Sequence, residues 1–117
     1  MPFKFEKLEV WRESIELTGI ISDVSTKFPG AEKFVLTSQI QRAADSVSLN
    51  IAEDSTGQSD PEFAKFLGYS IRSGAEVIGC IYLAKRRKII SDEDFNLIYN
   101  FTDKLIRRIQ TLRNTLR

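Results

Sequence analysis

The chain has 117 residues and a formal net charge of +1, with 42% hydrophobic and 28% charged residues. These values are close to globular averages, so they exclude a disordered or fibrous chain and predict one domain with a single core. No apolar run approaches the roughly 20 residues that span a bilayer, and the N-terminus lacks the apolar core of a signal peptide. Cys80 is the only cysteine, which excludes an internal disulfide framework. We therefore predict a cytoplasmic protein without a membrane segment.

The N-terminal part of the chain predicts one long helix. After a short extended lead-in at residues 1–5, apolar residues at helical spacing extend over residues 6–27. The FPG sequence at residues 28–30 ends this helix, because proline disfavours the α conformation of the preceding residue and glycine provides turn freedom. Residues 31–35 are expected to form a short helical turn.

The second helix is predicted to begin between residues 32 and 37 and to end near Asp54. Its apolar residues recur at steps of three and four and form one buried stripe: Leu36, Ile40, Ala43 or Ala44, Val47 and Ile51. A polar row follows at the same spacing, one position earlier: Gln39, Arg42, Ser46, Asn50 and Glu53. This row either forms hydrogen bonds between helices, with Arg42 paired to Glu76 or another carboxylate, or it contacts a ligand.

Two further helices follow. The polar loop at residues 55–59 leads to Asp60, which is predicted to cap a third helix over residues 61–88 with proline at its first position. Ser91 is predicted to cap the fourth helix, with Asp94 three positions later, and apolar periodicity continues to the C-terminus. Four helices with short connections predict an all-α, antiparallel up-down-up-down four-helix bundle.

The third helix has two unusual features. Gly68, Gly74 and Gly79 lie in its interior, where each glycine costs about 1 kcal/mol relative to alanine, which favours close approach by a neighbouring element. Its face opposite the core stripe still carries apolar residues, namely Tyr69, Cys80 and Leu83. A helix that is apolar on two faces often has two partners, so we predict homo-oligomerisation. Scattered surface hydrophobic residues are the alternative.

The sequence has no signature of catalysis. It contains no histidine, which removes the usual acid-base and triad chemistry and the commonest metal ligand. Cys80 has no second cysteine nearby and is interpreted as a small buried hydrophobic residue. Neither glycine-rich phosphate loop motif occurs. We predict that the protein is not an enzyme and has no metal or cofactor.

Positive charge is concentrated in the C-terminal third. Residues 1–84 contain 8 Lys and Arg against 12 Asp and Glu, whereas residues 85–117 contain 9 against 4. The basic candidates for nucleic-acid binding are Lys85, Arg86, Arg87 and Lys88, at the end of the third helix, and Arg107, Arg108 and Arg113 on the fourth. Together they are predicted to form a basic stripe that binds phosphates. There are two alternative interpretations: these side chains form an ordinary solvated helix surface, or the cations at the end of the third helix interact favourably with its dipole.

Tyr82 and Tyr99 lie close to this basic sequence. Their rings could stack on bases. Packing in the core or in an interface is the alternative interpretation of both residues. The sequence alone therefore leaves the role of the two tyrosines open.

Three sequence strings resemble a known family. They are FEKLEVW at residues 5–11, FPGAEKFVLTSQIQRAADSVSLNIAE at residues 28–53 and SGAE at residues 73–76. They resemble the bacterial four-helix-bundle proteins encoded in intervening sequences of 23S ribosomal RNA genes. The chain departs from the family at Asp54, where glycine is usual, and at Gln41, where a second arginine is frequent.

The resemblance implies a left-handed antiparallel bundle, often assembled as a barrel-like homopentamer, without known enzymatic activity. A related branch, the accessory variability determinant of diversity-generating retroelements, binds nucleic acid and a reverse transcriptase and is typically more basic. Two hypotheses follow. The protein is a homo-oligomer that binds RNA or DNA through its basic surface, or it is an interaction scaffold for a protein partner such as a reverse transcriptase.

Overall fold

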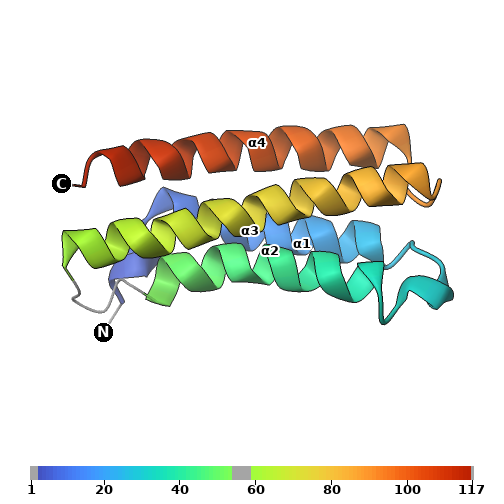
Figure 1. Cartoon of the computed structure of the whole chain (residues 1–117), viewed down its shortest axis with the longest axis horizontal. Coiled ribbons are helices and arrows are strands. Elements are labelled where there is room, and N and C mark those ends of the chain that lie inside the picture. Colours follow the sequence, from blue (N-terminus) through green and yellow to red (C-terminus); the bar gives the residue numbers. More distant parts are fainter. Residues whose placement is uncertain (1–2, 54–58, 117) are drawn as a thin grey trace.

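The structure, a computed structural model, describes residues 3–53 and 59–116. Within these residues it contains no strand, and its helices are α1 (Glu9–Ser25), α2 (Leu36–Glu53), α3 (Asp60–Arg86) and α4 (Asp92–Asn114), with short 3₁₀ helices η1 (Lys4–Lys7) and η2 (Gly30–Glu32). Successive α-helices run in opposite directions along one long axis (Figure 1). The predicted all-α antiparallel four-helix bundle is confirmed.

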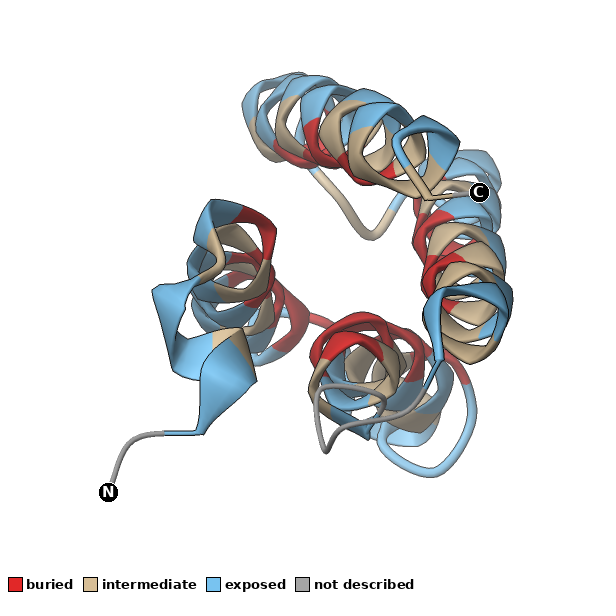
Figure 2. Cartoon of the chain, turned by 90° about the vertical axis from the view of Figure 1, so that its left-hand side faces the viewer, coloured by how far each residue is buried: buried red, intermediate tan, exposed pale blue. Residues whose placement is uncertain are grey.

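The bundle is elongated, with extents of 43 × 26 × 18 Å. Seen end-on, the helices follow one another around the axis in chain order and turn their buried residues inward (Figure 2). Among helices that are neighbours around the bundle, packing is most extensive between α2 and α3 and least extensive between α1 and α4. The apolar stripe predicted for the second helix is buried at every position: Leu36, Ile40, Ala43, Ala44, Val47 and Ile51.

The first helix begins later than its periodicity predicts. Leu8 has an extended backbone (φ −82°, ψ 124°) and separates η1 from α1. The Glu6 carboxylate accepts a hydrogen bond from Phe3 N–H at 2.6 Å and closes a tight local turn. The predicted extended segment at residues 1–5 and the helix start at residue 6 are therefore wrong over the described residues, because the Glu6 side chain stabilises a separate 3₁₀ turn.

Side-chain caps set the starts of α3 and α4. Ser91 Oγ accepts a hydrogen bond from Asp94 N–H at 3.0 Å, as predicted. At α3 the N-cap is Ser59, whose Oγ accepts from Glu62 N–H at 3.4 Å. The prediction that Asp60 caps α3 is wrong, because the helix begins one residue earlier. Asp60 instead lies in the first turn, where its carboxylate interacts favourably with the helix dipole.

α3 ends at Arg86, two residues before the predicted boundary, in a Schellman motif. Lys88 N–H donates to Lys85 O at 3.0 Å. Ile89 N–H donates to Ala84 O, also at 3.0 Å. This geometry places Lys88 in the left-handed region, with φ 59°. Glycine is preferred at such a position because it has no Cβ to collide with the backbone.

Replacing Lys88 with glycine is therefore expected to raise the free energy of unfolding by about 1 kcal/mol. Glycine avoids the steric cost of a Cβ in the left-handed region, and this gain exceeds the larger conformational entropy that glycine loses on folding. Urea denaturation measures the change. Lys88→Ala removes the same charge but keeps the Cβ, so it should give no gain. Equal stabilisation by both substitutions would assign the effect to charge rather than to backbone conformation.

Cys80 is fully buried, at 0% exposure. The prediction that Cys80 shares an outer apolar face with Tyr69 and Leu83 is wrong, because α3 packs against both α2 and α4 and so buries a wide arc of its surface. Burial, with a further contribution from the Glu76 carboxylate, raises the pKa of the Cys80 thiol to about 11. The interpretation of Cys80 as a small buried hydrophobic residue is confirmed, while Leu83 remains exposed.

Candidate nucleic-acid interface

The basic cluster at the end of α3 is exposed at all four positions, but its members differ in their partners. Arg87 Nη1 forms an ion pair with Glu32 Oε1 at 2.9 Å. The same carboxylate oxygen accepts from Leu36 N–H at 3.4 Å, so Arg87 ties the α3–α4 turn to the start of α2. Over the described residues, Lys85, Arg86 and Lys88 form no ion pair with a carboxylate. These three cations are available to an anionic ligand, and Arg87 is held in the structure.

Aromatic rings lie beside the cluster on α3 and α4. Tyr82 is 51% exposed and Tyr99 is 37% exposed. Both rings pack on Phe95, with centroid distances of 5.1 Å from Tyr82 and 6.1 Å from Tyr99. Lys85 Nζ lies 4.7 Å from the Phe95 ring centroid. This arrangement presents two partly exposed tyrosine rings next to an unpaired cation, a combination suited to bases and phosphates.

The predicted basic residues of α4 do not extend this cluster. Arg107 Nε pairs with Asp103 Oδ2 at 3.2 Å on the same helix. Arg108 bridges to α1 through Glu9 Oε2 at 2.8 Å and Glu13 Oε1 at 3.1 Å. Both arginines lie more than about 20 Å along α4 from its first residue, given the rise of 1.5 Å per residue.

Arg113 lies still further along α4, near the start of α3, where its Nε donates to Ala64 O at 2.9 Å. The structure thus divides the predicted basic stripe among three separate places: the end of α3, the middle of α4 and the start of α3.

Part of the predicted polar row joins α2 to α3. Asn50 Nδ2 donates to Ser46 O at 2.8 Å and to Ser46 Oγ at 3.0 Å. Ser73 Oγ, from α3, lies 3.0 Å from Ser46 Oγ. Next to this network, the buried Ser70 Oγ donates to Val47 O at 2.7 Å. The geometry therefore favours the structural interpretation for both residues: Ser46 connects α2 to α3, and Asn50 bonds to Ser46 within α2.

The other members of the row lie on the surface. Gln39, Arg42 and Glu53 are exposed on α2, and Glu76 is exposed on α3. Among the described ion pairs, none joins Arg42 to Glu76, so that expected pairing is wrong in this structure. Gln41, at the position where the resembled family often has arginine, lies next to this row. Its Nε2 donates to Ser25 Oγ at 2.9 Å and links α2 to α1.

Sequence reasoning identified Arg113 as a basic candidate but did not predict that it lies with Lys65 and Arg72 around a hollow on the outer surface of α3 and α4. This hollow has a volume of about 410 Å³ and is lined by Lys65, Gly68, Tyr69, Ile71, Arg72, Gln110 and Arg113. Lys65 and Arg72 are seven positions apart, so they lie on the same face of α3. That spacing could have been recognised in the sequence. The proximity of Arg113 to these two residues could not, because it depends on the register of α4 against α3.

The described residues contain no group of three side chains that could hold a metal ion. None of the helices within residues 3–53 and 59–116 is both long and apolar enough to cross a membrane.

Fold and surface together define a small antiparallel helical bundle with an exposed cationic and aromatic end. The family model described as 23S rRNA-intervening sequence protein matches residues 6–111, so the chain belongs to this family. A crystal structure of a protein of unknown function from the S23 ribosomal protein family of Bacteroides thetaiotaomicron VPI-5482 has the same fold, with a TM-score of 0.81 and 24% sequence identity, covering 89% of this chain and 97% of that chain. No curated protein matches the chain.

Proposed function

We propose that this protein is a non-enzymatic homo-oligomeric helical bundle, a pentamer, that binds nucleic acid through a basic surface. The observation that carries the proposal is the group of exposed cations Lys85, Arg86 and Lys88 at the end of α3, which form no ion pair within the described residues, together with the partly exposed rings of Tyr82 and Tyr99. Phosphates attract such cations without base-specific contacts, and tyrosine rings stack on any base. The family description refers to an intervening sequence of 23S rRNA, which makes RNA the first nucleic acid to test.

The absence of enzymatic activity is part of the proposal. The sequence contains no histidine, and its single thiol, Cys80, is fully buried. With its pKa raised to about 11, the thiol of Cys80 stays protonated at neutral pH and makes a poor nucleophile. These features support a binding role for the protein.

The proposed self-association is supported by large apolar side chains that the single chain leaves exposed. Phe34 is 86% exposed, Val35 54%, Leu49 64% and Leu83 44%. Covering apolar surface on assembly is favourable by about 25 cal/mol per Å². Light scattering at micromolar concentration tests this part: we expect a particle of about five chain masses, and a monomer would overturn it.

The nucleic-acid part is tested with two double variants of equal net charge. We expect Lys85→Gln/Arg86→Gln to weaken binding to a structured RNA at least about tenfold and to reduce the salt slope by about 0.7–0.9 per lost phosphate contact. Arg107→Gln/Arg108→Gln removes cations that already have carboxylate partners, so it should have a much smaller effect. Fluorescence anisotropy over a salt series measures both quantities. Equal losses in the two variants would overturn the assignment of the basic end of α3.

A second candidate function is an interaction scaffold or accessory subunit that docks a protein, such as a reverse transcriptase. The exposed Phe34 favours it, because a side chain of this size at 86% exposure suits a protein interface. Light scattering with and without RNA separates the two candidates. A particle whose mass rises with RNA at low salt and falls again as salt increases supports nucleic-acid binding. An oligomer indifferent to RNA at both salt concentrations supports the scaffold.

A further inference from the structure

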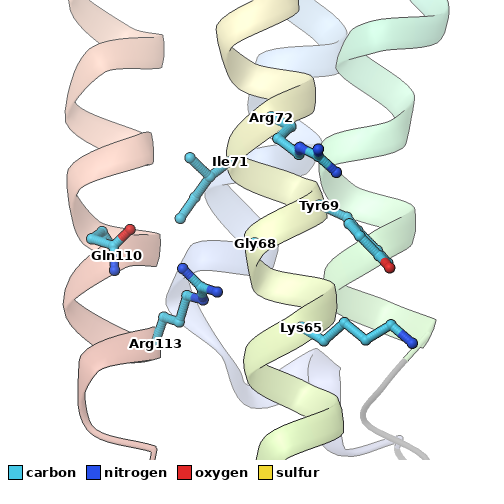
Figure 3. A pocket seen from close by; sticks show the side chains of 7 residues that line it. All are labelled: Lys65, Gly68, Tyr69, Ile71, Arg72, Gln110 and Arg113. Carbon is cyan, nitrogen blue, oxygen red and sulfur yellow. The ribbon is translucent and has the colours of Figure 1, made fainter.

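The hollow on the outer surface of α3 and α4 is built around Gly68. Arg113 reaches across from α4, and its guanidinium group lies against α3 at this glycine (Figure 3). A Cβ added at position 68 would lie 3.3 Å from Arg113 Nη2 and 3.4 Å from its Cζ. The Arg113 Nε also donates to Ala64 O at 2.9 Å. Gly68 thus leaves the space in which Arg113 is anchored on the α3 backbone.

This anchoring uses only part of the hydrogen-bonding capacity of Arg113. A guanidinium group has five N–H donors, and the bond to Ala64 O uses the one on Nε. Within the described residues, the Nη groups of Arg113 donate to no protein acceptor and form no ion pair. A planar fork that is already fixed in position is the geometry that binds a phosphate through two parallel hydrogen bonds.

Two more cations, Lys65 and Arg72, line the same hollow from α3. In Figure 3, Lys65, Tyr69 and Arg72 extend from α3 away from Arg113. The guanidinium carbon of Arg72 lies 6.0 Å from the Tyr69 ring centroid. No carboxylate lines the hollow, and over the described part of the chain neither Lys65 nor Arg72 has an ion-pair partner. The lining of the hollow is therefore cationic, and the carboxylates of Glu62 and Glu76 lie one helical turn beyond Lys65 and Arg72 on the same helix.

We propose that this hollow is a second contact site for a nucleic-acid backbone, which crosses α3 at Gly68. Arg113 binds one phosphate of the nucleic acid. Lys65 and Arg72 bind phosphates further along the same nucleic-acid strand, and Tyr69 is placed to stack on a base. The site lies near the opposite end of α3 from the cluster at Lys85 and deepens the proposed function, on which it rests.

The divergence of the cations favours a chain of phosphates over a single anion. Lys65 and Arg72 leave α3 about 40–60° around the helix from Gly68, where Arg113 is anchored, and their side chains extend away from Arg113 in Figure 3. A phosphodiester backbone carries a charge at every nucleotide, so it can contact cations that diverge in this way. The absence of a side chain at Gly68 lets this backbone approach the helix closely.

The test compares RNA binding by the full chain and two variants, using fluorescence anisotropy across a salt series. We expect Arg113→Gln to weaken binding about three- to tenfold and to reduce the salt slope by about 0.7, the value for one phosphate contact on a single strand. Gly68→Ala moves the anchored guanidinium by a few tenths of an ångström and places a methyl group where the phosphate backbone would approach, without removing charge, so a loss of about twofold or more is expected. Its thermal midpoint should stay unchanged or rise, because alanine favours the helix. Lys104→Gln, an exposed cation elsewhere on α4, is the charge-matched control for Arg113→Gln.

The outcomes separate this site from the proposed function. If Arg113→Gln and Gly68→Ala bind as the unmodified chain does while Lys85→Gln/Arg86→Gln is weakened, the second site is overturned and the proposed function stands. If the unmodified chain binds no RNA at low salt, both are overturned. If Arg113→Gln does not fold, Gly68→Ala decides alone, and an unchanged affinity in that variant overturns the site. Equal losses in Arg113→Gln and Lys104→Gln would also overturn it, because they indicate a general charge effect.

Discussion

Replacing Gly74 with alanine is expected to lower the free energy of unfolding by about 1–3 kcal/mol, although alanine is the better helix former. Gly74 is buried where α3 and α4 approach closely. A Cβ at this position would lie 2.8 Å from Ile106 Cγ1 and 2.9 Å from Ile106 Cδ1. Because Ile106 Cγ1 is not the free end of the side chain, either Ile106 must leave its rotamer or one of the two helices must shift. Urea denaturation followed by circular dichroism measures the change.

Gly79 provides the matched control on the same helix. Nothing lies within 4 Å of a Cβ built at Gly79, so Gly79→Ala is expected to raise the free energy of unfolding by up to about 1 kcal/mol. Truncating the opposing side chain should relieve the clash. The loss of unfolding free energy in Gly74→Ala/Ile106→Ala is therefore expected to be smaller than the sum of the losses in the two single variants. Equal effects of alanine at Gly74 and Gly79 would contradict the close approach of α3 and α4.

Replacing Ile81 with alanine is expected to lower the free energy of unfolding by about 2–5 kcal/mol. Ile81 is fully buried in the core, at 0% exposure, so its truncation removes apolar contacts and leaves a cavity. Leu83, two positions further along α3, is 44% exposed on the outer surface. In the isolated chain, Leu83→Ala should change stability by less than about 0.5 kcal/mol. Chemical denaturation of both variants under the same conditions checks the contrast.

The same pair also tests the proposed assembly. If Leu83 lies between copies of the chain, Leu83→Ala will reduce the particle mass in light scattering while each chain keeps its helical content. A loss of stability from Leu83→Ala as large as that from Ile81→Ala, without a change in particle mass, would contradict the orientation of α3 described here.

Much of the secondary structure could be read from local sequence signals. The start of α4 depends on Ser91 and Asp94, which are three residues apart and need no distant contact to form their hydrogen bond. The buried stripe of α2 follows from the 3.6-residue turn alone, because apolar residues at that spacing necessarily share one face. The family could also be recognised from the sequence, since its motifs are contiguous strings that the family model matches over residues 6–111.

Only the tertiary structure decided which polar and charged groups meet. Cys80 was misplaced because periodicity gives the angle around a helix but not how many neighbours the helix has, and α3 has two. Arg108 looked available in the sequence, yet the rotation and register of α4 against α1 bring it to Glu9 and Glu13. Arg113 likewise reaches α3 at Gly68 only in this register. Local patterns thus determined the helices and the fold class. The distribution of free charge over the surface was decided by packing, because ion pairs depend on contacts between residues far apart in the chain.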